Sequence, residues 1–248
     1  MAAARYSPAS KKDPVESIRE FIGDPAAPVR FERTMTNVMG ENIDMYTVNM
    51  DRFAVDAETG TLISASFISL SPVTAGNYSL DTAGAVGLAY AKKNYPDFSV
   101  RNMQLTESKT LDHGAGGVEY SFTWSEQSYG INIGNYVHVS VDPLGRILNY
   151  FARDIPAPGV EPAKIGKETA NTTAVDYVIT STRISNITSI ESTSQLTVLP
   201  TDQKRVVWNV NLAIHFRSPD YGGMEDHRGG IVWVDAMNGS VVGYEPCM

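Results

Sequence analysis

The clearest alternation of hydrophobic and polar positions lies near the end of the chain, in the stretch KRVVWNVNLAIHF that ends at Phe216. From Trp208 onward every second residue is apolar, and polar residues such as Asn209 and Asn211 stand between them. Successive side chains of a strand point to opposite sides, so a period of two predicts a strand with one buried face. Shorter alternating runs predict further strands in residues 29–38, 42–50, 117–126, 135–142 and 194–199.

Three other stretches, residues 13–23, 79–96 and 166–181, have the composition and spacing of helices. In the first, Asp13 followed by Pro14 is a favoured helix start and Gly23 a natural end. In the second, Asp81 is a good N-cap and Pro96 would stop the helix. Each predicted helix comes before a group of predicted strands.

A short hairpin sequence closes each of these groups, written FAVDAETGTLISAS, VSVDPLGRILNYFA and IVWVDAMNGSVVGYE. In each copy an aspartate begins the turn, where its carboxylate can accept backbone N–H groups, and a glycine supplies the positive φ that closes it. The alternative is a shared surface role at the hairpin tips, but we interpret these residues as structural turn formers. They are Asp56, Gly60, Asp142, Gly145, Asp235 and Gly239.

The repeated order of one helix followed by several strands predicts an α+β fold of three tandem units, each a helix packed on an antiparallel β-sheet. We place the units at residues 1–72, 73–157 and 158–248, with joints in the Pro- and Gly-containing stretches 69–79 and 154–166. Units of this size are small for independent cores. We therefore expect them to pack on each other or to continue one another's sheets.

The hairpin pattern, with a Val-Asp pair before the turn and a glycine within it, resembles that of the PepSY domain. The copy ending in GYE matches best and the copy beginning at Val139 diverges most, since Pro143 replaces an alanine and the turn is shorter. The resemblance implies an extracytoplasmic, non-catalytic module of the kind found in propeptides of secreted metallopeptidases. It implies a secreted or surface-tethered location, with any signal or anchor outside this sequence.

The composition and charge of the chain limit the kinds of partner that it can bind. The 20 Lys and Arg against 28 Asp and Glu give a net charge of −8, and no basic stripe of the kind that binds nucleic acid is present. No apolar run approaches the roughly 20 residues of a membrane-spanning helix. The single Cys247 forms no intramolecular disulfide, which leaves the compartment open. Glycosylation acceptor sequences occur at Asn77, Asn171, Asn186 and Asn238.

One connection near the C-terminus, residues 215–230, concentrates groups that bind metals: Asp220, Glu225, Asp226 and His227. Their order has neither the spacing of a calcium loop nor that of a zinc helix, so a solvated polar hairpin loop explains them as well. No nucleotide-binding loop and no Gly-x-Ser-x-Gly elbow occurs. We therefore expect no cofactor, no catalytic residue and no enzymatic activity.

The aromatic residues mostly fall on predicted strands, where they would pack in a core, but some could line a groove for a peptide. A sheet with an uncovered edge or face can accept an additional strand. The predicted function is therefore binding of a protein or peptide, with restraint of a peptidase as its specific form. The alternative is a ligand- or metal-binding sensor of the cell envelope.

Overall fold

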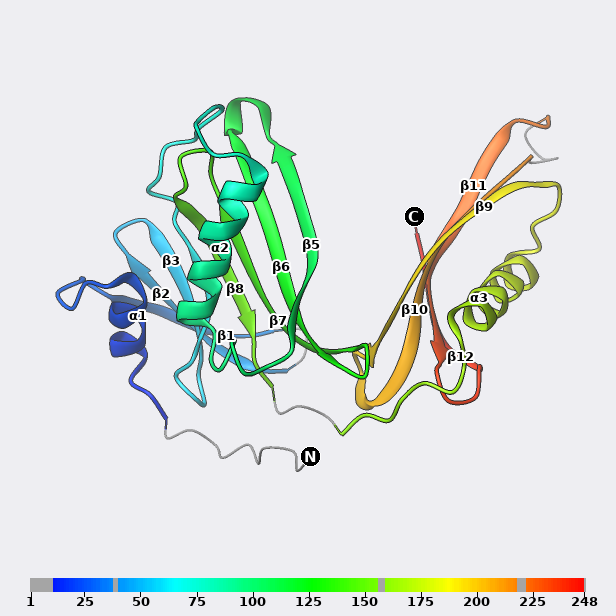
Figure 1. The fold of residues 1–248 in the computed structure, drawn as a ribbon, viewed down its shortest axis with the longest axis horizontal. Helices are drawn as coiled ribbons and strands as arrows, with labels where there is room; N and C mark the ends of the chain where they lie inside the picture. The colour runs from blue at the N-terminus through cyan, green and yellow to red at the C-terminus, as the bar shows by residue number, and fades with distance from the viewer. Residues whose placement is uncertain (1–10, 38–39, 156–158, 218–221, 248) are drawn as a thin grey trace. The chain divides into compact units, whose positions relative to one another are not determined.

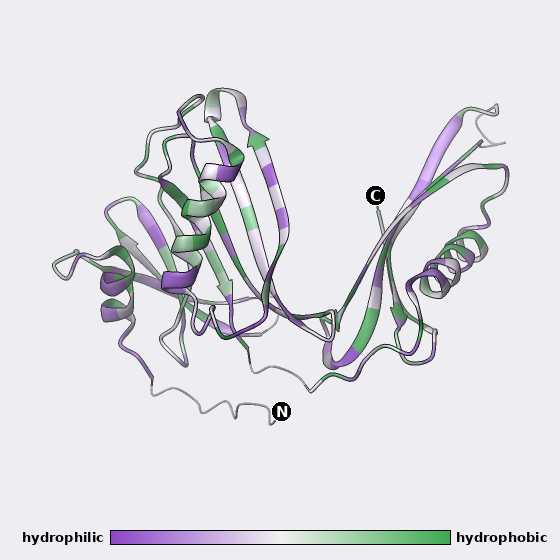
Figure 2. Cartoon of the chain, in the orientation of Figure 1, coloured by the Kyte–Doolittle hydropathy of each residue, from purple (hydrophilic) through white to green (hydrophobic). Residues whose placement is uncertain are grey.

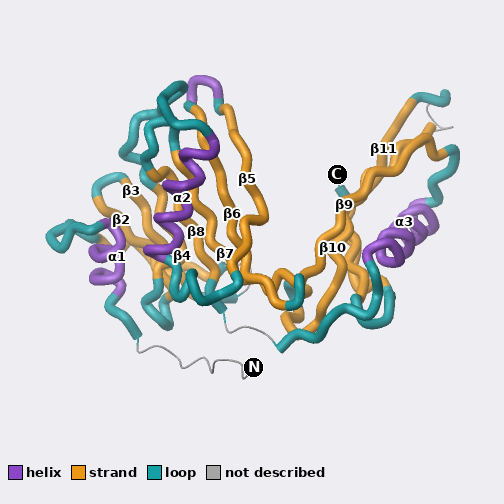
Figure 3. Tube along the Cα trace, in the orientation of Figure 1, coloured by secondary structure: helices purple, strands orange, loops and turns teal. Residues whose placement is uncertain are grey.

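The computed structural model describes residues 11–37, 40–155, 159–217 and 222–247, and within them the chain is rich in strands with three α-helices (Figures 1 and 3). The elements are α1 (Pro14–Ile22), β1 (Arg30–Thr36), β2 (Asn42–Val48), β3 (Asp51–Asp56), β4 (Leu62–Ser66), α2 (Leu80–Asn94), β5 (Met103–Asp112), a short 3-10 turn η1 (Gly114–Gly116), β6 (Val118–Ser128), β7 (Ile131–Val141), β8 (Ile147–Arg153), α3 (Lys167–Thr182), β9 (Ile187–Leu199), β10 (Asp202–Arg217), β11 (Glu225–Asp235) and β12 (Val241–Pro246).

The helices form where the pattern predicts them, and the first is capped as expected. The Asp13 carboxylate accepts the backbone N–H groups of Val15 and Glu16, and Gly23 ends α1 in the left-handed conformation. The N-cap of α2 is Ser79, not Asp81: the Ser79 hydroxyl accepts the backbone N–H of Thr82. Asp81 lies within the first turn, where its charge still favours the helix dipole.

The chain divides into two compact units. Unit 1 comprises Met1–Glu126 and Asn135–Pro156, and unit 2 comprises Gln127–Gly134 and Ala157–Met248, in each case for the residues described. The tip of the hairpin between β6 and β7 thus belongs to unit 2.

In unit 1 the strands follow the order β1-β2-β3-β4-β8-β7-β6-β5, and α1 and α2 pack on the sheet. A single core lies beneath both helices. Phe21 of α1 contacts Phe53 of β3 and Tyr150 of β8, and Tyr90 of α2 also meets Tyr150. The helices α1 and α2 therefore share one hydrophobic core.

In unit 2 the strands β9-β10-β11-β12 form an antiparallel meander, with α3 packed on it. Ala174 and Val178 of α3 are fully buried against apolar residues such as Val210 and Val232. Hydrophilic residues dominate the first part of β11, as Figure 2 shows. Where β7 begins, Asn132 pairs in parallel with Thr197 of β9, and both residues lie in unit 2.

The predicted fold class of three tandem units, each with its own antiparallel sheet, is wrong. Strand pairing joins the described strands into one twelve-stranded mixed sheet with three helices. Alternation along the sequence shows which residues form strands, but it does not show which strands pair across distant segments. Here β4 pairs with β8, and Ala65 lies opposite Tyr150. The residue boundaries 1–72, 73–157 and 158–248 remain a prediction from the repeat pattern.

Candidate functional site

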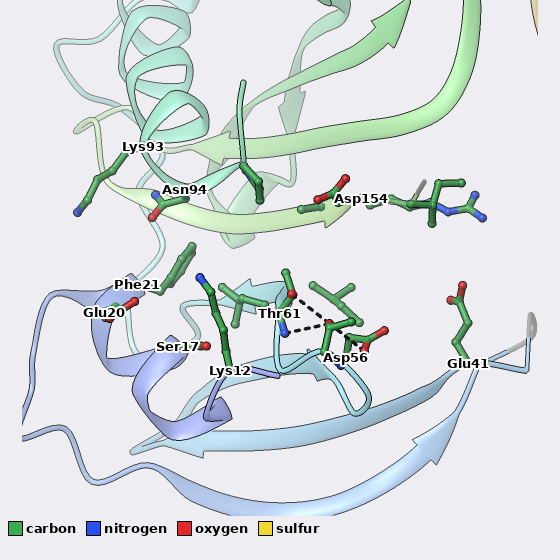
Figure 4. Close-up of a pocket in the computed structure, with 17 residues that line it drawn as sticks. Lys12, Ser17, Glu20, Phe21, Glu41, Asp56, Thr61, Lys93, Asn94 and Asp154 are labelled. Carbon is green, nitrogen blue, oxygen red and sulfur yellow. Dashed lines mark hydrogen bonds between the residues drawn. The ribbon is translucent and has the colours of Figure 1, made fainter. Parts of the chain in front are cut away.

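The sheet of unit 1 opens between β4 and β8. Their antiparallel register runs from Ser66 opposite Asn149 to Ser64 opposite Phe151. One residue further on, Ile63 and Ala152 line a cavity of about 340 Å³ instead (Figure 4). We call this opening the β4–β8 split. Leu62 and Ile63 line it from β4, and the segment 152–155 lines it from the end of β8.

One wall of the split is the turn that begins at Asp56. Its carboxylate accepts the backbone N–H groups of Glu58 at 2.9 Å and Thr59 at 2.7 Å, as well as the Thr59 hydroxyl at 3.0 Å. Gly60 closes the turn with φ +72°, and a Cβ atom there would clash with the Lys12 carbonyl oxygen. The Lys12 N–H donates to the Thr59 carbonyl at 2.9 Å, so the turn is fastened to the start of α1.

The opposite wall is held by a largely buried ionic cluster. Nη1 of Arg101 lies 2.7 Å from Oδ1 of Asp154 and 3.4 Å from Oε2 of Glu126. It also donates to the Tyr95 hydroxyl oxygen at 3.1 Å. Burial acts to lower the pKa of Arg101, but the Asp154 hydrogen bond and the neighbouring groups outweigh it and raise the pKa. The guanidinium therefore stays charged and fixes Asp154 at the cavity wall.

The side chain of Asn135, in β7, holds the same wall through hydrogen bonds to the backbone of Ile155. It is fully buried, and its amide donates to the Ile155 carbonyl at 3.0 Å while its carbonyl accepts the Ile155 N–H at 2.9 Å. The amide also donates to Glu126 at 2.9 Å. The Tyr95 hydroxyl donates to the Arg153 carbonyl at 3.0 Å, and burial raises its pKa, so this donor keeps its proton. The end of β8 is thereby fastened to β7 and α2, on the far side of the split from β4.

Charged side chains line the split from both walls. Lys12 and Glu20 come from the chain at and before α1, Glu41 from the turn between β1 and β2, and Lys93 from the last turn of α2. Apolar groups lie between them, among them Phe21 and Leu62. A cavity between two strand ends that no longer pair with each other, with apolar surface and both signs of charge, is suited to holding a segment of polypeptide.

The other predicted turn residues lie outside this cavity. Asp142 is 1% exposed, accepts the N–H groups of Leu144 and Arg146 and pairs with the Arg146 guanidinium at 2.6 Å. Gly145 has φ +80°, and a Cβ atom there would lie 2.7 Å from the ring of Tyr78.

The third turn has the same construction, in unit 2. Asp235 accepts the N–H groups of Met237 and Asn238 and pairs with Arg205 at 2.7 Å, and Gly239 has φ +77°. Of the six turn residues, only Asp56 lines the β4–β8 split. In all three turns these residues shape the backbone.

The metal-ligand candidates do not converge. Glu225, Asp226 and His227 are successive residues of β11, so their side chains alternate between the two faces of the sheet. Asp220 lies outside the described residues. His227 faces His215 of β10, with 6.1 Å between ring centroids. In the described part of the chain no group of three or more potential ligands is placed to hold a metal.

Sequence reasoning missed Arg101, Asn135 and Asp154, although one of them left a signal. In the run INIGNYVHV the inward positions are Ile131, Ile133, Asn135 and Val137, so an amide occupies an apolar position of the alternation. A buried amide needs hydrogen-bond partners, which marks it as part of a polar network. Arg101 and Asp154 stand in loops without any pattern.

Comparison with known proteins defines the fold and not the activity. No family model matches the chain, and no curated protein matches it. Among solved structures, an uncharacterized protein from Eubacterium rectale is similar with a TM-score of 0.54 and 12% identity, over 94% of this chain and 81% of that one. The Bacillus megaterium YpeB C-terminal domain aligns with a TM-score of 0.49 and 14% identity, over 97% of this chain and all of that one.

Among the described residues, no helix has both the length and the apolar character needed to cross a membrane.

Proposed function

We propose that this chain is a non-enzymatic, extracytoplasmic module that binds an extended segment of another protein in the β4–β8 split. The observation that carries the proposal is the split itself, where two neighbouring strands separate around a cavity of about 340 Å³. Ligand cavities in proteins begin at about 300 Å³. Both walls are fixed by hydrogen bonds, so the opening is formed before anything enters it.

Strand addition explains why a polypeptide is the best occupant. An extended segment gains main-chain hydrogen bonds from a strand edge, and its alternate side chains enter neighbouring pockets. Here both strands that border the cavity continue beyond Ser64 and Phe151, the last residues that pair β4 with β8. Asp56 and Asp154, the carboxylates nearest to strand ends, are already engaged by hydrogen bonds, which supports a binding role over acid–base catalysis.

The kind of protein that supplies the bound segment is proposed from the resemblance of the hairpins to those of PepSY modules. Such modules accompany secreted peptidases, so restraint of a peptidase is the specific form of the proposal. In that form the module would hold a segment of the peptidase or of its propeptide, and peptide hydrolysis would slow as the module is added.

The test is a paired capture experiment. Ser17 lies on the cavity wall and is half-buried, so Ser17→Phe fills the split from the α1 side. Lys93→Trp fills it from an exposed position of α2, where the fold tolerates a large side chain. Thr169→Phe, at an exposed position of α3, is the matched control.

Wild-type protein and the three variants are immobilised and exposed to the secreted and envelope proteins of the source. The proposal expects proteins retained by the wild type and the control and lost from both filled variants. Any retained peptidase is then assayed with and without the module. Identical retention on all four matrices would refute the split as the binding site.

A further inference from the structure

Two lysines reach into the split from opposite walls at the same end. Lys12 lies two residues before the start of α1, and Lys93 lies in the last turn of α2, as Figure 4 shows. Both are exposed, and neither takes part in an ion pair of the described residues. The position of Lys93 favours α2 through the helix dipole, but no such reason applies to Lys12, which precedes α1.

Ser17 of α1 also lines the cavity, and its hydroxyl has no hydrogen-bond partner among the described residues. The Ser17 Oγ atom is inaccessible to solvent and makes no hydrogen bond within the described part of the chain. Buried hydroxyl groups are nearly always hydrogen-bonded, because leaving one unpaired costs free energy. Because this oxygen is closed to solvent, we assign Ser17 no contact with a ligand and treat it as part of the cavity wall only.

Three of the four labelled carboxylates of the cavity lie away from the two lysines, as Figure 4 shows. Asp154 shares Arg101 with Glu126, and Oδ1 of Asp56 accepts the turn N–H groups. Glu41 lies at the opposite end of the cavity, where it accepts a hydrogen bond from Asn37. Glu20 is the one cavity carboxylate near the lysines, and the two lysines outnumber it.

We infer that the lysine end of the β4–β8 split recognises a carboxylate of the bound segment, held between Lys12 and Lys93. This inference rests on the proposed function and specifies its ligand as an acidic extended peptide. The net charge of the chain is −8, so a cationic end within it selects where an acidic segment can approach. The carboxylate can belong to a side chain or to a C-terminus.

Three pentapeptides separate these sources. Acetyl-Val-Thr-Glu-Thr-Val-amide carries only a side-chain carboxylate, acetyl-Val-Thr-Gln-Thr-Val acid carries only a terminal one, and acetyl-Val-Thr-Gln-Thr-Val-amide carries neither. Dissociation constants are measured by calorimetry with the full chain at 50 and 200 mM NaCl. At least one acidic peptide is expected to bind about fivefold more tightly than the neutral one, and less so at high salt.

Substitutions assign the effect to residues. Lys12→Gln and Lys93→Gln should each weaken binding of that acidic peptide about threefold and leave the neutral peptide unchanged. Lys92→Gln is the matched control, since Lys92 is exposed on the same helical turn and does not line the cavity. Glu20→Gln should strengthen binding of the acidic peptide by a similar factor, because it removes a negative charge that repels the peptide carboxylate.

The two proposals fail differently. Equal binding of all three peptides, lost in Ser17→Phe and unaffected by the lysine substitutions, would leave the split as a peptide site and overturn carboxylate recognition. Preference for an acidic peptide that persists in both lysine variants would also overturn it. Absence of measurable binding by every peptide would reject the carboxylate inference, while the capture experiment still decides the proposed function.

Discussion

Gly60 shows how much a single turn position constrains this protein. It combines a positive φ with a Lys12 carbonyl oxygen where a side chain would begin, and these are two separate reasons for glycine. The sequence pattern predicts the first reason from the turn. The second comes from the packing of α1, which no local pattern contains.

Replacing Gly60 by alanine should therefore lower the free energy of unfolding by about 3 kcal/mol. The usual loss at a left-handed position is about 1 kcal/mol. Gly23→Ala is the matched comparison, because Gly23 has φ +74° and no atom lies within 4 Å of the place where the alanine methyl group would stand. Urea denaturation of both variants measures the difference. Equal losses would mean that the Lys12 contact relaxes without cost.

Asp235 makes stability depend on acid pH. Burial acts to raise its pKa, but the Arg205 hydrogen bond and the N–H groups of Met237 and Asn238 lower it below the ordinary value of 3.8. The unfolded chain therefore binds a proton first as the pH falls. The stabilisation is fully present above the ordinary pKa and is lost as the pH drops through the folded one.

Arg205→Met removes the main cause of that shift and should destabilise the protein by about 1 kcal/mol at pH 7 and by less near pH 3. Lys204→Met, at the neighbouring exposed position of β10, is the charge-matched control. Chemical denaturation as a function of pH tests this. A loss that stays constant between pH 7 and pH 3 would contradict the assigned role of Asp235.

At the scale of elements, periodicity predicts the three helices and most strands, because each depends on neighbouring residues. The three hairpin turns are likewise local, and Asp and Gly alone predict them. The pairing of β4 with β8 is not local: it joins Ser66 with Asn149, whose side chains bond at 2.7 Å across 83 positions of sequence. The candidate site exists because this pairing stops, so sequence patterns alone could not have located it.

The end of β8 should depend on Asn135. Asn135→Leu keeps the side-chain size but leaves the Ile155 backbone N–H and carbonyl without their partner. We expect a loss of about 3 kcal/mol and faster hydrogen exchange at Ile155. Peptide binding at the split should weaken as well.

The comparison variant for Asn135→Leu is Asn149→Leu, which removes a side-chain hydrogen bond to Ser66 at the closed part of the same strand pair. It should cost less and leave exchange at Ile155 unchanged. If both variants alter hydrogen exchange at Ile155 equally, the Asn135 side chain does not fix the end of β8 in the way that we assign to it.

At the scale of the whole molecule, the buried apolar residues that the structure describes form one cluster in unit 1 and two in unit 2. In unit 1 the apolar residues of two helices pack on one sheet, while in unit 2 one cluster lies under α3 and the other includes Ile131 and Ile133 of the hairpin tip. A larger shared core excludes more surface from water than two small ones. This accounts for the packing of α1 and α2 on one sheet in a single compact body.

Separate cores should respond separately. Val178→Ala, in the buried face of α3, should cost about 2 kcal/mol and speed hydrogen exchange in α3, β10 and β11. Amides of β3 and β8 should keep their protection. Ala91→Gly, in the buried face of α2, is the converse probe in unit 1, and uniform acceleration across the chain in either variant would show one cooperative unit.

The hairpin tip 127–134 has a consequence for the order in which the chain is made. Ile131 and Ile133 are buried in unit 2 against Val198, Val206 and Ala236, and Asn132 bonds to Thr197, a residue 65 positions later. A ribosome adding about 5–20 residues per second needs roughly 3–13 s to supply that partner. During this interval Ile131 and Ile133 lack the residues that bury them, so their apolar side chains have no partners in unit 2 at least until Val198 and Val206 have been made.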